Sequence, residues 1–537
     1  MKLFSFFIVS IYFACSNVTF ANDKIHTLLP AFESYIQKAM QEWGAPGVAV
    51  AIVKDGQVIY QKGFGVTEVG KQQPVDEHTV FPIASLSKNF LASLMVQLVD
   101  EGKLALDDPV LKHLPDFVLS DPEITKQFTV RDLLSHRSGL KHFAADTFWY
   151  LGTSADEIRT FMSKLPFIAP FRQSYGYQNQ MYGTASILAE KVTGQSIKDL
   201  YTKHFFEPLG MHDSSVGLEG ATLSPPQTLW QKIKGFFRKI PPKNIAVPHH
   251  VIDGKTTALP ISFHMYTFAG STGINTSAAD MAKWMLMQLA NGKVNDKQII
   301  SQAGIQEMRK PEISAKDLRP DDSQFPGKQI QNVNYGMGWF IYDFMVGNKK
   351  VPMIGHMGGF AGVRSLITLV PSENLGIIIL SNFGAMRLSM LPDALRARFF
   401  DLYYDLPESD WSMNFLKRMQ DIRDKNKQYK VSYRLQNPKA AQPLEKYAGE
   451  FGNDLYGKFK LVIKEGQLWM HYRDKVVPLK HWNADEFSFK GNDLTPVYST
   501  YDEGYIEFGF QKSMTKADLC AVNLFPEGKD DLFRRVE

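Results

Sequence analysis

The stretch Ser85-Leu86-Ser87-Lys88 places an amine three residues after a hydroxyl, just before an apolar helical pattern that begins at Phe90. Residues three apart share one face of a helix, so the Lys88 ammonium can reach the Ser85 hydroxyl. The helix N-terminus also favours the negative charge of a deprotonating hydroxyl. A serine needs such help because its hydroxyl is a weak nucleophile at neutral pH. Alone, this spacing is common and equally describes a solvated helix turn.

Two further motifs follow in the chain. In Tyr175-Gly-Tyr-Gln-Asn179, the hydroxyl of Tyr177 can relay protons, and the amide of Asn179 can hold Lys88 or a substrate amide. In Gly355-His-Met-Gly-Gly359, His356 lies on an expected strand edge, and Gly358 lets a substrate backbone approach. Each motif has a structural alternative, a turn with a buried tyrosine or a core histidine beside a glycine turn. Their order after Ser85 favours nucleophilic catalysis.

This ordered set resembles the penicillin-recognising serine hydrolases, which include AmpC-like β-lactamases, low-molecular-weight penicillin-binding proteins, D-aminopeptidases and related esterases. The resemblance covers about residues 27 to 400. It implies Ser85 as nucleophile, Lys88 and Tyr177 as the proton-handling pair, and Asn179 as a substrate-binding amide. It also implies His356-Met357-Gly358 in place of Lys-Thr-Gly, and an oxyanion hole formed by the backbone N–H groups of Ser85 and Gly359.

Two other stretches are typical of the same family, Thr129 to Gly139 and Ala269 to Gly273. Both are expected to be structural, with His136 as a packed or loop-capping residue. The histidine at position 356 departs from the Lys-Thr-Gly pattern, because an imidazole is cationic only part of the time near neutral pH. The resemblance therefore implies an esterase or a hydrolase of peptides or D-amino-acid peptides, with poor β-lactamase activity.

The elements that position these residues are read from apolar patterns. Hairpins are expected at residues 47–60 and 366–380, and helices around residues 90–98, 187–192 and 281–289. Helices between two halves of an antiparallel sheet give an α+β fold, of the β-lactamase/transpeptidase-like type by the resemblance. We expect a hydrolase domain at 22–405, a helical connector at 406–443, and a small all-β barrel or sandwich at 444–537, which looks like a lipocalin-like module.

Composition excludes several classes of protein. The chain has 537 residues, 44% of them hydrophobic, so it has the material for a large core. Lys and Arg (60) barely exceed Asp and Glu (56), which disfavours a nucleic-acid partner. Cys15 and Cys520 are too few for a thiolate metal cluster. The pair His249-His250 points apart in an extended segment, so we expect no metal and no other cofactor.

The first 21 residues have the pattern of a secretory signal, with a short apolar run followed by Thr19-Phe20-Ala21. A retained anchor and lipidation at Cys15 are alternative interpretations. A signal predicts export to a bacterial periplasm or exterior. A second special segment is the insertion at about 225–242, where Leu229 to Ile240 forms a basic amphipathic pattern. This pattern suits the surface of an anionic membrane, or equally a helix packed on the enzyme as a lid.

Together these observations predict an exported serine hydrolase that is acylated at Ser85 by an amide or ester and then deacylated by water. The expected substrate is a small molecule or peptide, including cell-wall fragments. The alternative is a penicillin-binding or peptidoglycan-sensing protein with slow or no turnover. The sequence leaves the acyl group, the leaving group and the oligomeric state open.

Overall fold

The computed structural model describes residues 4–221, 244–252, 254–261, 263–316, 329–384, 389–433, 438–494, 503–511, 515–523 and 532–536. The predicted amphipathic insertion at 225–242 therefore lies outside the described residues. The chain divides into two compact units that interleave along the sequence. Unit 1 comprises residues 1–108, 133–135 and 185–419, and unit 2 comprises residues 109–132, 136–184 and 420–537.

Unit 1 is built on an eight-stranded antiparallel sheet in the order β10-β11-β12-β13-β14-β15-β1-β2. The predicted hairpins are confirmed as β1 with β2 and β14 with β15. All residues of β1, β14 and β15 are buried, as their β-branched runs predict. The strands are β1 (Gly47–Lys54), β2 (Gln57–Gly65), β10 (Ile313–Ser314), β11 (Ile330–Tyr335), β12 (Phe340–Val346), β13 (Lys349–Phe360), β14 (Val363–Val370) and β15 (Leu375–Ser381).

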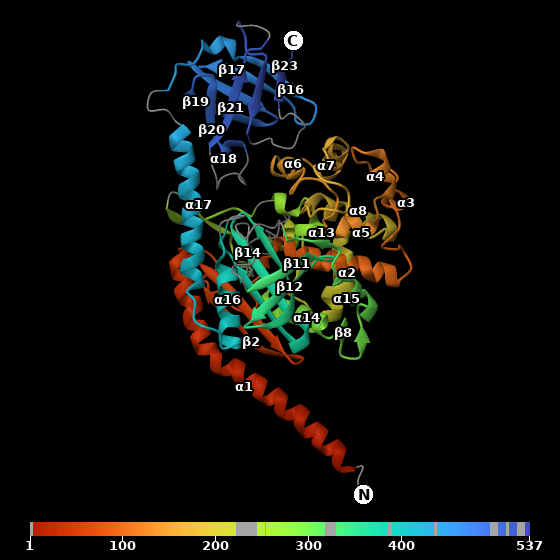
Figure 1. Cartoon of the computed structure of the whole chain (residues 1–537). Helices are drawn as coiled ribbons and strands as arrows, with labels where there is room; N and C mark the ends of the chain where they lie inside the picture. The colour runs from red at the N-terminus through yellow and green to blue at the C-terminus, as the bar shows by residue number, and fades with distance from the viewer. Residues whose placement is uncertain are drawn as a thin grey trace, which may run out of the picture. The chain divides into compact units, whose positions relative to one another are not determined.

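Helices cover both faces of this sheet (Figure 1). Side chains alternate between the faces of a strand, so Gly358 of β13 shares a face with its partner Ser365 of β14. This face is covered by η1 (Ala84–Leu86), which leads into α2 (Ser87–Asp100), and by α14 (Ala278–Leu289). The opposite face carries Arg364, which pairs with Asp393 of α16 (Leu391–Tyr403). Helix α1 (Phe4–Trp43) packs on α16.

The remaining elements of unit 1 are short. They are β3 (Phe81–Pro82), α9 (Ile197–Tyr201), η3 (Thr202–Phe206), α10 (Glu207–Leu209), β4 (Ser215–Val216), α11 (Leu218–Ala221), β5 (His249–Ile252), β6 (Lys255–Ala258), η5 (Phe263–Tyr266), α13 (Ala269–Thr272), β7 (Ile274–Thr276), β8 (Lys293–Val294), β9 (Lys297–Gln298), α15 (Gln302–Met308) and η7 (Pro371–Glu373). Helix α8 (Asn179–Thr193) begins in unit 2 and continues in unit 1, and α17 (Trp411–Tyr433) begins in unit 1 and continues in unit 2.

Unit 2 contains a helical part and a closed barrel. The helical part has α3 (Val110–His113), α4 (Pro122–Gln127), α6 (Asp146–Tyr150), α7 (Ala155–Phe161) and η2 (Met162–Lys164), and α5 (Val130–Leu134) lies across the division between the units. Its centre is the buried carboxylate of Asp132, which pairs with Arg137 at 2.7 Å and Arg172 at 2.6 Å. His136 is fully buried, and its Nδ1 accepts the N–H of Gln178 at 3.1 Å. The Thr129 to Gly139 stretch is thus part of the packing here.

The barrel confirms the small all-β domain expected at the C-terminal end. Its strands are β16 (Gly449–Asn453), β17 (Gly457–Lys464), β18 (Gln467–Tyr472), β19 (Lys475–Asn483), β20 (Glu486–Lys490), β21 (Glu503–Gly509), β22 (Leu519–Val522) and β23 (Leu532–Arg535), and they close into one antiparallel sheet. Helices η8 (Leu444–Lys446) and α18 (Gly491–Leu494) accompany it. Rings of Phe451, Phe459, Phe508 and Phe533 pack together and are buried.

Of the predicted signal at residues 1–21, the described residues 4–21 lie within helix α1. Among the residues described, we find no helix with the length and apolar character needed to cross a membrane. Processing of the first 21 residues stays a prediction.

Candidate active site

Ser85 lies in the single turn η1 that leads into α2, as its position before an apolar helical pattern predicts. The Lys88 Nζ atom donates to the Ser85 Oγ atom at 3.2 Å. Lys88 is fully buried and also donates to the carbonyl oxygen of Ser271 at 3.3 Å. The amine is therefore held beside the hydroxyl with little water around it. This is the geometry that a serine nucleophile and its base require.

The chain before Ser85 is fixed from three sides. The N–H of Ile83 donates to the carbonyl of Ile274 at 3.0 Å, and the Ile83 carbonyl accepts from the Ser365 hydroxyl at 2.8 Å. The Ser87 hydroxyl accepts the N–H of Ile274 at 3.1 Å. Ala84 has a φ of 46°, a left-handed conformation that an alanine rarely adopts. These bonds hold an unfavourable turn directly before the candidate nucleophile, which is where backbone strain is often found in active sites.

Strand β13 passes directly over this turn. A Cβ atom added to Gly358 would lie 2.0 Å from the Ile83 carbonyl oxygen and 2.5 Å from the Ser365 Oγ atom. Only a glycine allows the two backbones to approach so closely. The register also matters, because β12 pairs with β13 only up to Gly355, whereas β14 pairs with β13 up to Phe360. Within the described residues, the ladder of 356–360 thus continues with β14 on one edge and no longer with β12 on the other.

The structure corrects the expected charge of His356. Its side chain is buried, and burial together with the nearby charge of Lys88 lowers its pKa from 6.5 to about 3. Its Nδ1 lies 2.7 Å from the carbonyl oxygen of Met357, which can only accept, so Nδ1 carries the proton. Its Nε2 then accepts from the hydroxyl of Tyr335 at 3.3 Å. We expected an imidazole that is cationic part of the time, and find a neutral one at neutral pH.

Tyr177 and Asn179 belong to unit 2, at the start of α8. The Tyr177 N–H donates to Nδ1 of His142 at 3.1 Å, and its carbonyl accepts the N–H of Phe143 at 2.7 Å. Its ring lies 4.3 Å from the His136 ring. The Asn179 amide donates through Nδ2 to the carboxylate of Asp146 at 2.7 Å. Both residues are nearly buried, and their orientation is set by these partners.

The predicted residues thus fall into two groups. Ser85, Lys88, His356 and Gly358 come together in unit 1, and Tyr177 and Asn179 come together in unit 2. The sequence reasoning missed Ser271, although the stretch Ala269 to Gly273 was singled out as structural.

Two further partners were missed. Ser365 bonds the turn before the candidate nucleophile. It lies in a mostly apolar strand, and the sequence gives no sign of this contact. Asp146 is a single carboxylate in an otherwise apolar stretch, and this could have marked it for attention.

A family model described as "Beta-lactamase" matches residues 32–397, which is more than half of the chain. The chain belongs to the Beta-lactamase family. This confirms the resemblance drawn from the motifs, and the chain is a serine hydrolase of that family. A second model, for a domain of unknown function (DUF3471), matches residues 433–520, which include most of the barrel.

Relatives within and around the family cover most of the chain. The unguisins hydrolase ungD of Aspergillus violaceofuscus (strain CBS 115571) is 26% identical over 82% of this chain and 77% of its own length. Penicillin-binding protein 4 of Amycolatopsis lactamdurans is 28% identical over 66% of this chain and 85% of its own length. The octameric penicillin-binding protein homologue from Pyrococcus abyssi has a similar fold, with a TM-score of 0.57 and 22% identity, over 94% of this chain and 99% of that one.

Two other places in unit 1 lie apart from these residues. His249 is buried, with Nδ1 3.2 Å from the Asn382 carbonyl and Nε2 accepting the Val69 N–H at 2.9 Å. Both ring nitrogens of His249 thus contact backbone groups. The described part of this Beta-lactamase family chain contains no group of three or more His, Cys, Asp or Glu side chains placed to hold a metal ion.

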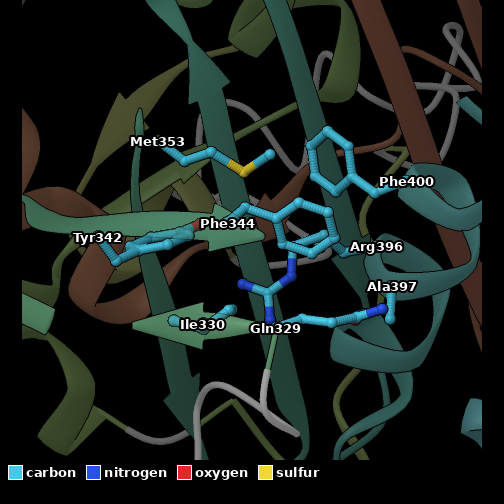
Figure 2. A pocket seen from close by; sticks show the side chains of 8 residues that line it. All are labelled: Gln329, Ile330, Tyr342, Phe344, Met353, Arg396, Ala397 and Phe400. Carbon is cyan, nitrogen blue, oxygen red and sulfur yellow. The ribbon is translucent and has the colours of Figure 1, made fainter. Parts of the chain in front are cut away.

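The second place is a pocket at Tyr342, Phe344 and Met353, with the guanidinium of Arg396 among the side chains that line it (Figure 2). It encloses about 10 Å³, which is room for one water molecule. Met353 and Gly355 alternate with His356 and Gly358 along β13, so this pocket opens on the face of the sheet that α16 covers. It is separate from the candidate active site.

Proposed function

We propose that this serine hydrolase acts on an amide or ester through an acyl-enzyme on Ser85. The observation that carries the proposal is the 3.2 Å contact between the Lys88 amine and the Ser85 hydroxyl at a helix start. In its neutral form the amine can take the hydroxyl proton as Ser85 Oγ attacks the substrate carbonyl carbon. The backbone N–H groups of Ser85 and Gly359 are the proposed donors to the oxyanion that forms.

The tetrahedral intermediate then collapses, and the carbon–leaving-group bond breaks. Lys88 and Tyr177 are the proposed route by which the proton reaches the departing amine or alkoxide. A water molecule attacks the acyl-enzyme, the same pair moves its proton to Ser85 Oγ, and the carboxylic acid leaves. Asn179, His356 and Gly358 are the proposed substrate-binding residues. Their geometry within each unit supports these roles, because each side chain or backbone is tightly fixed by its neighbours.

The proposed substrates are esters and peptides, including D-amino-acid peptides, more than β-lactams. The neutral His356 supports this preference, because it offers no fixed positive charge for the carboxylate of a β-lactam or a D-alanyl peptide. Among the relatives, the name "unguisins hydrolase" also agrees with hydrolytic activity.

The test is labelling and turnover in matched variants. Wild type is expected to gain one adduct with a fluorophosphonate, detected by intact mass, and to hydrolyse a short-chain p-nitrophenyl ester. Ser85→Ala should lose both activities, and Lys88→Met should be severely impaired. The control is Ser163→Ala, which removes a hydroxyl bonded only locally to Thr160 within the helical part. Turnover by Ser85→Ala above about a tenth of wild type, a change of only ~1.4 kcal/mol, would falsify the assignment.

A penicillin-binding protein with slow turnover is the second candidate function, and the similarity to penicillin-binding protein 4 favours it. The two candidate functions differ in the lifetime of the acyl-enzyme. A penicilloyl adduct on Ser85 that persists for hours, with no ester turnover, would support the second function. Rapid ester hydrolysis with multiple turnovers would support the first.

We also propose that the protein is exported to a bacterial periplasm or exterior and that Leu229 to Ile240 contacts an anionic membrane. The segment carries cations beside aromatic residues and lies outside the described residues. Wild type should then sediment with phosphatidylglycerol vesicles more than with neutral ones, and Phe236→Asp should reduce this while ester turnover is kept. Equal sedimentation of both proteins, or loss of turnover in Phe236→Asp, would overturn the membrane contact. Cleavage after Ala21, read by N-terminal sequencing, tests export.

A further inference from the structure

Unit 2 contains a chain of contacts that starts at the barrel and ends at Asn179. We propose that Asp146 is a positioning residue for the Asn179 amide, and that the C-terminal barrel holds Asp146 in place through helix α6. The inference rests on the proposed function, because Asn179 is there a substrate-binding residue. It assigns a role in the reaction to a domain whose matching family model has no known function.

The contact between Asp146 and Asn179 is buried and directional. Asp146 is 2% exposed and Asn179 is 4% exposed, and the Nδ2 to Oδ2 distance is 2.7 Å. Asn179 Nδ2 is the donor in this bond, so the NH₂ group of Asn179 faces Asp146. The amide carbonyl oxygen then faces away from the carboxylate. The Asn179 amide has nearly the same shape when its oxygen and nitrogen atoms are exchanged. Asp146 thereby selects one of these two orientations.

The backbone reinforces this arrangement. Ala145 has a φ of 66° and turns the chain into α6, and the Asp146 N–H donates to the Phe143 carbonyl at 2.9 Å. Phe143 in turn donates its N–H to the Tyr177 carbonyl. The segment 143–146 thus contacts the Tyr-x-Asn motif twice, through the backbone of Tyr177 and the side chain of Asn179.

The other side of this helical part contacts the barrel. Phe148 of α6 is fully buried, and its ring stacks on Tyr456 of the turn between β16 and β17, with centroids 5.2 Å apart. Arg473, in the turn between β18 and β19, donates to the Thr153 hydroxyl at 2.6 Å. Thr153 is 2% exposed, lies three residues after the end of α6, and donates its N–H to the Phe148 carbonyl at 3.0 Å. The Lys164 ammonium donates to the Asp454 carbonyl at 2.7 Å.

These three contacts come from two neighbouring turns of one closed barrel, and Tyr472 links the turns by donating to the Tyr456 carbonyl at 2.9 Å. A closed barrel is a stiff support because all its strands are paired. A shift of α6 moves Asp146 with it, since Phe148 and Asp146 lie on the same helix of five residues. Small displacements of this kind in a positioning group can cost about 100-fold in rate.

The first experiment is a double-mutant cycle on kcat/KM for the p-nitrophenyl ester. Asn179→Leu and Asp146→Leu are each expected to lower kcat/KM by at least tenfold, and the double variant should be no worse than Asn179→Leu. Residues that act through one another are not additive. Asp146→Asn, which keeps the shape and one accepting oxygen, should recover part of the loss. Multiplicative losses in the double variant, or full turnover in Asp146→Leu, would overturn the role of Asp146.

The second experiment tests the barrel with Arg473→Met, which removes the bond to Thr153 and keeps the apolar stem. Lys460→Met is the matched control, because Lys460 is an exposed cation on β17. We expect Arg473→Met to lower kcat/KM about three- to tenfold in wild type and to change nothing in the Asn179→Leu background, while Lys460→Met changes neither. Equal effects of Arg473→Met in both backgrounds, or none in wild type, would overturn the coupling.

Fluorophosphonate labelling and ester turnover of Ser85→Ala distinguish a failure of the proposed function from a failure of the positioning role. If Ser85→Ala is still labelled and still active, the proposed function fails. If Ser85→Ala is inactive but Asp146 and Asn179 act independently, only the positioning role fails. Thermal unfolding of each variant separates a loss of fold from a loss of positioning, because Asp146→Asn should unfold close to wild type while it loses rate.

Discussion

Replacing Gly358 by alanine tests whether the turn before Ser85 is held by the close passage of β13. The new Cβ atom would lie 2.0 Å from the Ile83 carbonyl oxygen, whereas ordinary contacts begin near 3.4 Å. Either the strand or the turn must therefore move by about 1.4 Å, the difference between 3.4 and 2.0 Å. Overpacking of this kind costs about 1 to 3 kcal/mol of stability. A shift of about 1 Å at the nucleophile can lower the rate about 100-fold.

The matched control is Gly355→Ala in the same strand. Its Cβ atom would lie 2.7 Å from the Ile367 carbonyl oxygen, on the opposite face of the sheet. Both variants should unfold at lower temperature than wild type. Only Gly358→Ala should lose kcat/KM for the p-nitrophenyl ester by about 100-fold, while Gly355→Ala stays within about threefold. If Gly358→Ala folds and keeps more than a third of wild-type turnover, the turn is not set by this contact.

The remaining predictions concern charge. His356 has its pKa lowered from 6.5 to about 3, so below pH 6.5 the unfolded chain binds a proton that the folded chain does not. Stability should fall as the pH drops from 6.5 toward 3, by up to about 1.4 kcal/mol per pH unit. His356→Gln should show a smaller fall in melting temperature over that range, and an identical fall would refute this. Asp132→Asn should cost about 3 kcal/mol in urea unfolding, because it leaves two arginines around a neutral side chain; a cost under about 1 kcal/mol would show that the ion pairs are dispensable. His356→Lys should raise kcat/KM for nitrocefin relative to the ester severalfold, because it introduces an amine where the imidazole is neutral; an unchanged ratio would mean that this position does not face a substrate carboxylate.

Local patterns predicted the elements around the site with small errors. The β-branched runs placed both hairpins within a few residues of β1, β2, β14 and β15, and the S-x-x-K spacing placed a helix start at Ser85. Within the helical connector expected at 406–443, the structure has helix α17 from Trp411 to Tyr433. The barrel-or-sandwich alternative at the C-terminal end is decided by closure of β16 on β23. The hairpins and helices depend on neighbours along the chain, whereas closure of the barrel joins its first and last strands.

Features that depend on distant neighbours were not visible in the sequence. The charge of His356 is set by burial and by Lys88, which lies 268 positions earlier, so the motif alone suggested an ordinary imidazole. The partner of Asn179 is Asp146, and no spacing rule connects the first residues of two helices that lie 33 positions apart. The contacts of Tyr456 and Arg473 with the helical part likewise join segments about 300 residues apart.

The pairing of β1 with β15 has a consequence for how the protein is made. Val48 pairs with Ser381, so the catalytic sheet cannot close until nearly all of the hydrolase portion has left the ribosome. At about 5 to 20 residues per second, the first hairpin waits roughly 20 to 60 s for its partner. During that time β1, which is apolar from Val48 to Val53, presents an unpaired edge, which is a template for aggregation. Any fragment that ends before Leu375 keeps this edge open, so truncated forms should require a chaperone or be degraded.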